Sequence, residues 1–195
     1  MGVKGTTNFD YLDCDEITTD SVVIGTTPIP PESFDLLKYV TATYYEINQA
    51  CDASHRVQNV TTTPYQLDST GDGGVIVLDK ADDGLALVLA PATGIGTRLK
   101  LYVKTTFTDD CTIKVTGDDI MKGYAILGTG DADNSTKFFG TAADTDTITL
   151  TGTTTGGIAG ATIELTDIAA NTWAVQVISS TDENAEQATP FSATV

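Results

Sequence analysis

The chain has 195 residues, of which 41% are hydrophobic and 19% charged. Because domains cluster at roughly 100 to 150 residues, this length predicts one main domain with an extension. The formal net charge is −17, from 10 Lys and Arg against 27 Asp and Glu. Nucleic-acid binding requires clustered cations, so this charge argues against a nucleic-acid partner, and it also disfavours an anionic membrane surface. It favours a soluble protein whose partner offers basic or apolar surface.

The segments that would direct the chain to a membrane are not evident. No stretch approaches the ~20 consecutive apolar residues of a membrane-spanning helix, and residues 1–10 lack the apolar run of a secretion signal. We therefore expect a protein made in the cytoplasm. Its three cysteines, Cys14, Cys51 and Cys111, are widely spaced and fit no metal or redox motif, so reduced, buried thiols are expected.

Residues 1–33 have the pattern of an N-terminal arm. The stretch ends at Pro28-Ile29-Pro30-Pro31, where prolines are expected to block regular strand pairing. Ser21–Ile24 is a short strand candidate. The apolar residues of the arm must be buried, either against its own domain or against a partner. The residues expected to contact a partner or a neighbouring subunit are Phe9, Tyr11, Leu12, Val22, Val23 and Ile24.

Residues 34–60 are expected to form a helical or mixed connector. Ser33 is a candidate N-cap for a short helix reaching Cys51, with Phe34, Leu37, Val40, Tyr44 and Ile47 near helical spacing. The run from Val40 to Tyr45 suits a strand equally well, since it is rich in β-branched and aromatic residues. The pattern leaves both alternatives open.

Residues 61–195 show the repeating pattern of an all-β domain. Leu99, Leu101 and Val103 alternate with polar residues, as in a half-buried strand. Short strands at such spacing, separated by Gly, Asp and Asn turns, predict a β-sandwich or jelly roll. The predicted strands are Thr63–Leu67, Val75–Leu78, Leu85–Leu89, Leu99–Phe107, Thr112–Val115, Ile120–Leu127, Lys137–Thr141, Thr147–Leu150, Thr162–Leu165 and Trp173–Ile178.

Candidate chemistry is sparse in this sequence. His55 follows Cys51 by four residues, but a metal bound by these two side chains would need two more ligands. The Gly-x-Gly motifs of the chain lack the third glycine of a dinucleotide-binding motif. A glycosidase needs two carboxyls at a defined separation, whereas turns favour Asp for its local backbone hydrogen bonds. We therefore predict no enzyme, metal or cofactor. The carboxylate pairs are Asp82-Asp83, Asp109-Asp110, Asp118-Asp119, Asp131-x-Asp133 and Asp144-x-Asp146.

A family resemblance covers residues 64–195. It rests on the order of several short motifs: Tyr65–Gly71 leading to Val75–Asp79, Leu87–Pro91 with Gly94, Gly117-Asp118 with Ile120 and Gly123, Gly156-Gly157-x-x-Gly160 leading to Ile163–Leu165, Trp173–Val175, and Thr189–Ser192. This arrangement resembles virion structural proteins of tailed bacteriophages, particularly head decoration (cement) proteins.

The resemblance implies a sandwich or jelly roll that trimerises and docks on the outer capsid lattice. The expected partners are the major capsid protein and further copies of the chain, and the expected location is the capsid exterior of the virion. The alternative is a receptor-binding or fibre-type appendage that contacts host glycan. A glycoside-active enzyme using paired Asp residues ranks third.

Overall fold

The computed structural model describes residues 22–24, 27–29, 57–80, 84–129, 135–182 and 185–194. The chain divides into two compact units, Met1–Cys51 and Asp52–Val195. The predicted helix at residues 33–51, and Phe9, Tyr11 and Leu12, lie outside the described residues. So does His55.

The described residues of the first unit form two short strands, β1 (Val22–Ile24) and β2 (Thr27–Ile29), which pair antiparallel. β1 confirms the strand predicted at Ser21–Ile24. The expectation that prolines prevent pairing is wrong for Pro28, which lies in β2 opposite Val23. Each strand of a two-stranded sheet has an unpaired side, so the N–H that proline lacks need not belong to the ladder.

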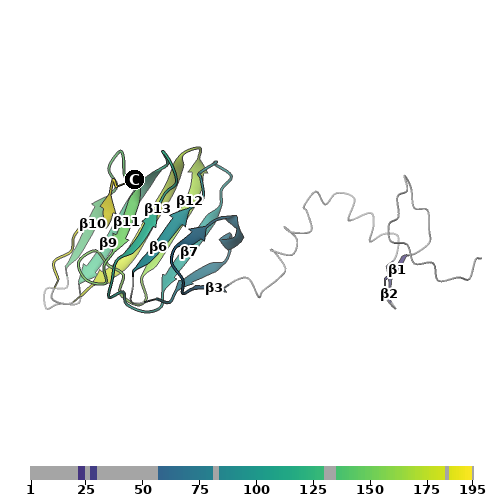
Figure 1. Ribbon diagram of the computed structural model, residues 1–195, viewed down its shortest axis with the longest axis horizontal. Coiled ribbons are helices and arrows are strands. Elements are labelled where there is room, and N and C mark those ends of the chain that lie inside the picture. The colour runs from purple at the N-terminus through teal and green to yellow at the C-terminus, as the bar shows by residue number, and fades with distance from the viewer. Residues whose placement is uncertain are drawn as a thin grey trace, which may run out of the picture. The chain divides into compact units, whose positions relative to one another are not determined.

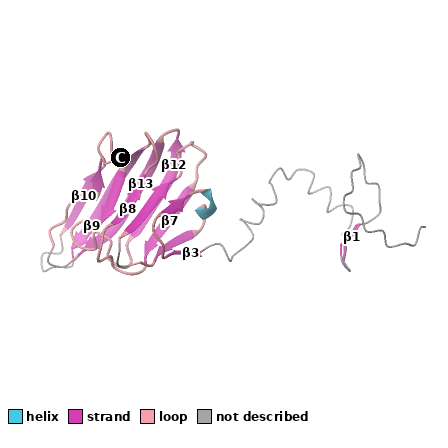
Figure 2. Cartoon of the chain, viewed as in Figure 1, coloured by secondary structure: helices cyan, strands magenta, loops and turns pink. Residues whose placement is uncertain are grey.

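The described residues of the second unit form twelve strands in two sheets (Figures 1 and 2). The larger sheet has the order β10-β9-β13-β12-β7-β5-β3 and the smaller one β14-β11-β8-β6-β4. A short 3-10 helix, η2 (Ser69–Gly71), precedes β5. The strands are β3 (Val57–Val60), β4 (Tyr65–Leu67), β5 (Val75–Leu78), β6 (Leu85–Leu89), β7 (Arg98–Val103), β8 (Cys111–Lys114), β9 (Ile120–Thr129), β10 (Thr136–Gly140), β11 (Thr147–Leu150), β12 (Thr162–Ala169), β13 (Thr172–Thr181) and β14 (Phe191–Ser192).

The first half of this unit alternates between the sheets strand by strand. β3, β5 and β7 are parallel neighbours in the larger sheet, and β4, β6 and β8 are parallel neighbours in the smaller one. Parallel neighbours require a crossover connection, which is usually a helix. Here the crossover is a strand of the opposite sheet. The result is an all-β sandwich of two mixed sheets, which confirms the sandwich alternative of the prediction.

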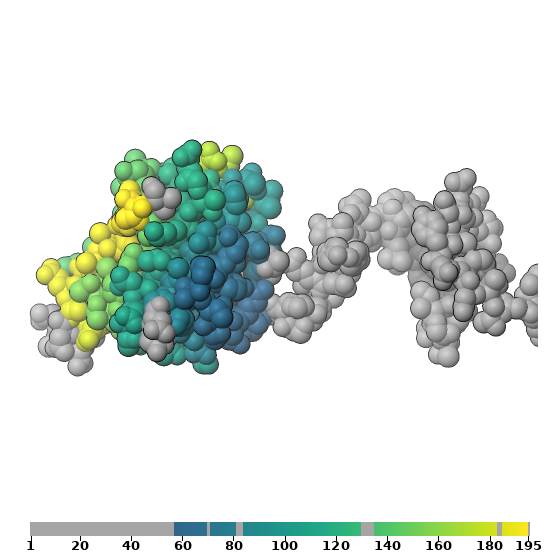
Figure 3. Space-filling view, viewed as in Figure 1, coloured from purple at the N-terminus to yellow at the C-terminus, as the bar shows by residue number. Residues whose placement is uncertain are grey.

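The sandwich has a consistent direction from one edge to the other. β3 and β4 are edge strands of their sheets, and β10 and β14 are the strands at the opposite edges. Figure 3 shows that the residues that follow residue 57 (blue) and the C-terminal residues (yellow) are at opposite sides of the surface. Sequence order is broken once in the larger sheet, where β12 and β13 lie between β7 and β9.

All ten predicted strands are present, with ends that differ by a few residues. Two strands of the second unit escaped prediction, β3 and the two-residue β14. β3 falls in the expected connector at residues 34–60, yet it pairs with β5, so the sandwich begins before residue 61. Among the described residues, no helix has the length and apolar character needed to cross a bilayer.

The core lies between the two sheets. Leu99, Leu101 and Val103 point inward as predicted, each with an exposed fraction of 1% or less. Trp173 is also buried in this core, with an exposed fraction of 2%. Because protein interiors are close-packed, each inward side chain constrains its neighbours across the layer.

We predict that the folded chain protects Cys111 from thiol reagents. This free cysteine is fully buried in the core, and burial raises the pKa of its thiol to about 12. The reactive thiolate is therefore scarce at neutral pH. Alkylation followed by peptide mass mapping should label Cys111 in denaturant and leave it unmodified in the native protein. Equal labelling in both states would contradict this burial.

We predict that Gly123→Ala strongly destabilises the sandwich. Gly123 lies opposite Val175 in the parallel pairing of β9 with β13, and an added Cβ would overlap the carbonyl oxygen of Val175. We expect the free energy of unfolding to fall by about 3 kcal/mol or more, because a backbone atom cannot move aside cheaply. Denaturant unfolding measures the change.

Gly140→Ala is the matched control. Gly140 lies in the edge strand β10, and a Cβ there meets no atom within 4 Å. We expect its unfolding free energy to stay within about 0.5 kcal/mol of the wild type. Similar losses in the two variants would disprove the close approach of β9 to β13.

Candidate functional site

The outer faces of the two sheets differ in character. The smaller sheet directs small and polar side chains outward: Gln66, Ala86, Val88, Thr112, Lys114, Thr147, Thr149 and Ser192. The larger sheet directs outward the aromatic residues Tyr102, Tyr124 and Phe138 and several cations, beside polar residues such as Thr166 and Gln176. Since soluble proteins rarely expose contiguous apolar surface without a use for it, the outer face of the larger sheet is the candidate functional site.

One row of apolar side chains crosses most of the larger sheet. The strand registers place its members directly opposite one another on β5, β7, β12, β13, β9 and β10. Their side chains share one face because residues at even spacing along a strand point the same way. We define the apolar row as these six residues, of which Val77, Tyr102, Ile178, Ile126 and Phe138 are aliphatic or aromatic and Thr162 is polar.

Three members of the apolar row are substantially exposed: Tyr102 by 42%, Ile178 by 46% and Phe138 by 66%. Phe138 also stacks on Tyr124, with ring centroids 5.2 Å apart. Tyr124 lies two residues from Ile126 on β9, so it widens the apolar surface at the β10 edge. The side chains needed for a flat, macromolecular contact are therefore in place.

Cations border the apolar row on the same face. Lys100 lies two residues from Tyr102 on β7 and forms an ion pair of 3.0 Å with Glu164 on β12. Arg98 and Lys122 occupy further outward positions on β7 and β9. We call this surface, made of the apolar row with Tyr124, Arg98, Lys100, Lys122 and Glu164, the basic–apolar face.

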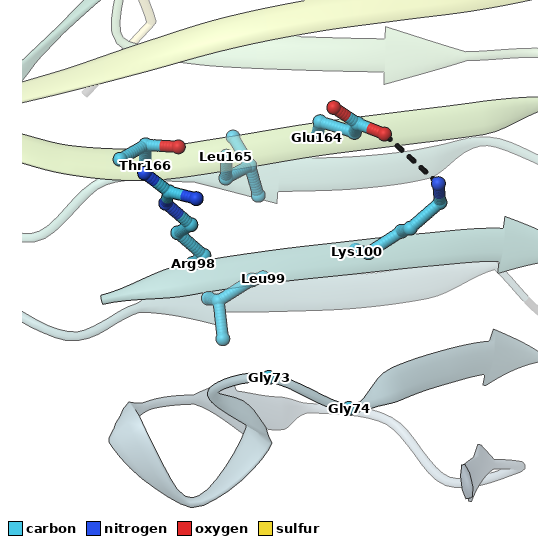
Figure 4. Close-up of a pocket in the computed structure, with 8 residues that line it drawn as sticks. All are labelled: Gly73, Gly74, Arg98, Leu99, Lys100, Glu164, Leu165 and Thr166. Atoms are coloured by element: carbon cyan, nitrogen blue, oxygen red, sulfur yellow. Dashed lines mark ion pairs between the residues drawn. The ribbon is translucent and has the colours of Figure 1, made fainter. Parts of the chain in front are cut away.

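A shallow hollow of about 230 Å³ opens on the basic–apolar face beside the start of β5. Gly73 and Gly74 form one side of it and have no side chains to fill it. Arg98 extends toward Thr166, and Lys100 reaches Glu164 (Figure 4). The hollow thus joins a guanidinium, a hydroxyl group and the ion pair of an ammonium with a carboxylate within one depression.

A buried carboxylate holds the loop that leads into this hollow. Asp167 is 2% exposed and accepts backbone N–H groups from Thr93, Gly94 and Ile95 at 3.0, 2.6 and 3.4 Å, together with the hydroxyl of Thr93. Its own N–H donates to the carbonyl of Thr97 at 2.9 Å. Asp167 therefore fixes the segment immediately before Arg98.

The start of β7 is held from a second side. The carboxylate of Asp72 accepts the N–H of Arg98 at 2.8 Å, and the N–H of Gly73 donates to the carbonyl of Arg98 at 3.4 Å. Gly94 needs its positive φ of 80° in the loop, where a Cβ would also press within 3.1 Å of the Ala169 backbone. The position of Arg98 is thus set by both neighbouring loops.

The pKa of Asp167 lies below its ordinary value of 3.8. Burial alone raises the pKa of this carboxyl, but the N–H groups and the hydroxyl that it accepts stabilise its charge and outweigh burial. Because the folded-state pKa is depressed, the contribution of Asp167 to stability is present above pH 3.8. It is lost as pH falls through the folded-state pKa.

The carboxylate pairs noted in the sequence separate into exposed and buried members. Asp118 and Asp144 are exposed, whereas Asp119 accepts the N–H of Ala92 at 2.6 Å and Asp146 that of Thr194 at 2.8 Å. These buried members serve the backbone, as the turn interpretation predicts. Within the described ranges from residue 57 onward, no three His, Cys, Asp or Glu side chains are grouped as metal ligands. Asp82, Asp83, Asp131 and Asp133 lie outside the described residues.

The contact residues predicted from the sequence belong to a different part of the chain. Val22, Val23 and Ile24 form β1 in the first unit, and their expected contacts remain a prediction. The basic–apolar face was not predicted from the sequence. One signal for it was available: in the alternating run at residues 98–104, the aromatic Tyr102 occupies a position on the side that otherwise carries cations.

Comparison with models of protein families, with curated proteins and with solved structures gives no match for this chain.

We predict that Asp167→Asn loosens the loop at residues 91–97. An amide offers one acceptor oxygen and places N–H groups against N–H donors, so at neutral pH the unfolding free energy should fall by about 1–3 kcal/mol. The exposed Asp144→Asn variant is the control and should unfold like the wild type.

Denaturant unfolding over a range of pH tests the sign of this effect. The difference in unfolding free energy between the wild type and Asp167→Asn should become smaller as pH falls below 3.8, because the wild-type carboxyl then becomes protonated. A gap that is constant between neutral and acidic pH would show that the charge of Asp167 is not what holds the loop.

Proposed function

We propose that this chain is a non-enzymatic virion structural protein of the head decoration type. It acts as a homotrimer that binds the major capsid protein on the capsid exterior and stabilises the shell. The observation that carries the proposal is the basic–apolar face, since three exposed large apolar side chains, Tyr102, Ile178 and Phe138, lie in one row on a protein of net charge −17, and such surface favours a macromolecular partner. The resemblance of residues 64–195 to decoration proteins supports the same class.

The shape of the face also supports a protein partner. The apolar row spans six strands of a sheet and includes the exposed Tyr102, Ile178 and Phe138. Aromatic residues and arginine are enriched in protein–protein interfaces. A small-molecule site, in contrast, is usually a concave cleft that buries most of its ligand.

The copy number in virions tests the proposal most simply. Quantitative mass spectrometry of virions that carry this chain should find it in a fixed ratio to the major capsid protein. A ratio far below that of the shell lattice would refute decoration. It would favour the second candidate, a fibre-type appendage that contacts host glycan, for which the exposed Tyr124–Phe138 stack offers an aromatic platform.

Incorporation into virions should depend on the apolar row. Tyr102→Ser combined with Ile178→Ser removes two exposed apolar side chains without opening the core, and we expect incorporation to fall about tenfold or more. Val88→Ser on the outer face of the smaller sheet is the control and should leave incorporation unchanged. Equal incorporation of both variants would exclude the apolar row from assembly.

The proposed role of the N-terminal arm has a separate test. Deletion of residues 1–33 removes Phe9, Tyr11, Leu12 and β1 while leaving the second unit whole. We expect this truncation to weaken trimerisation or shell binding. If the truncated protein trimerises and binds shells like the wild type, the arm has no part in assembly.

A further inference from the structure

The basic–apolar face reverses the sign of charge that the rest of the chain has. Its outward strand positions carry Arg98, Lys100 and Lys122 against Glu164, so three positive charges less one negative charge give +2. The whole chain has 10 Lys and Arg against 27 Asp and Glu. This local charge favours a partner surface that is acidic.

The hollow on this face has the chemistry of a carboxylate site. Lys100 already pairs with Glu164, and Asp72 accepts the backbone N–H of Arg98, but the Arg98 guanidinium has no carboxylate partner among the described residues. A guanidinium binds a carboxylate through two parallel hydrogen bonds, and the Thr166 hydroxyl lies beside it as a further donor. Gly73 and Gly74 line the same hollow and contribute no side chains to it, while the Arg98 side chain extends toward Thr166 (Figure 4).

The surroundings of the hollow indicate that the carboxylate belongs to a protein surface. Tyr102 is on the same face two residues beyond Lys100, and the apolar row continues from it to Phe138 at the β10 edge. A free small carboxylate would cover the hollow alone. A protein surface would cover the hollow and the apolar row together. The ion pair of Arg98 with the incoming carboxylate would then lie beside apolar contacts from which water is excluded.

We infer that the basic–apolar face binds a second copy of this chain, and that an aspartate from one of the copy's acidic turns enters the hollow beside Arg98. The inference rests on the proposed homotrimer. A closed ring of three requires heterologous contacts, in which one surface meets a different surface of the next copy. Packing of two basic–apolar faces against each other would instead bring like charges together.

The second copy carries carboxylates suited to this role. Asp109, Asp110, Asp118 and Asp144 are all exposed, and all lie in loops between strands of the second unit. Each loop projects from the sandwich, so its carboxylate is accessible to the flat face of a neighbour. Electrostatic attraction between the acidic loops of one copy and the basic–apolar face of another also favours association in this orientation over other orientations.

Sedimentation velocity of the full-length chain tests the inference. Arg98→Glu reverses one charge in the hollow, and Lys114→Glu makes the same change on the outer face of the smaller sheet. We expect the wild type and Lys114→Glu to form trimers at about 0.1 M salt and to dissociate at least tenfold more readily at about 1 M, where screening is strong. Arg98→Glu should be monomeric at both salt concentrations, with unchanged thermal unfolding of the monomer.

The outcomes separate this inference from the proposed function. Trimers of Arg98→Glu as stable as those of the wild type would overturn the inference and leave decoration standing. A wild type that is monomeric at both salt concentrations would overturn the inference and the proposed trimer together. Salt-sensitive trimers that are absent from capsids would overturn decoration alone.

A charge-reversal experiment identifies the turn. Arg98→Glu is mixed with a variant in which the acidic residues of one turn are changed to arginine: Asp109→Arg with Asp110→Arg, Asp118→Arg, or Asp144→Arg. Mixed assembly should return for one of the three turn variants, because the glutamate at position 98 then meets a cation. If no turn variant restores assembly, an aspartate from these turns does not enter the hollow.

Discussion

The inward side chains of two sheets meet in one apolar layer, and the chain reaches that layer by passing repeatedly between the sheets. β3 to β8 alternate strictly, so neither sheet can form without the other. Parallel pairing of β3, β5 and β7 depends on the strands of the smaller sheet as crossovers. The shared core is therefore the constraint that fixes strand order, register and the direction of every outward residue.

The outer faces follow from this constraint but are not equivalent. Where the core fixes Leu99, Leu101 and Val103 inward, Arg98, Lys100 and Tyr102 must point outward. Registers across β12, β13, β9 and β10 then bring Ile178, Ile126 and Phe138 into line with Tyr102, although they are distant in sequence. The apolar row is thus a consequence of strand order. Its exposure in an acidic protein is what supports a structural, assembly-forming role.

Two carboxylates, the buried Asp167 and the exposed Asp72, connect this architecture to the hollow. Asp167 belongs to β12, points inward and accepts N–H groups of the loop between β6 and β7, while Asp72 accepts the N–H of Arg98. Asp167 is stable in the interior only because its hydrogen bonds are satisfied. The two carboxylates hold the backbone before and at Arg98. The first residue of β7 is therefore fixed, and the guanidinium extends from a fixed backbone position.

Much of the fold could be predicted from the sequence because its turns are clearly marked. Gly and Asp clusters separate runs with period-two alternation, and all ten strands inferred from them are present. β3 was missed because Gln58 and Asn59 occupy its centre, and β14 because two residues show no period. Parallel pairing, the apolar row and the role of Asp167 depend on which strands become neighbours, and no local pattern contains that information.

Lysine footprinting of the assembled protein tests the central claim, that the basic–apolar face is buried by assembly. Lys100 and Lys122 lie on that face, and Lys114 lies on the outer face of the smaller sheet. Acetylation of trimers and of dilute monomers, followed by peptide mass analysis, should show Lys100 and Lys122 protected on assembly and Lys114 equally reactive in both. Undiminished reactivity of Lys100 and Lys122 in the trimer would contradict the account.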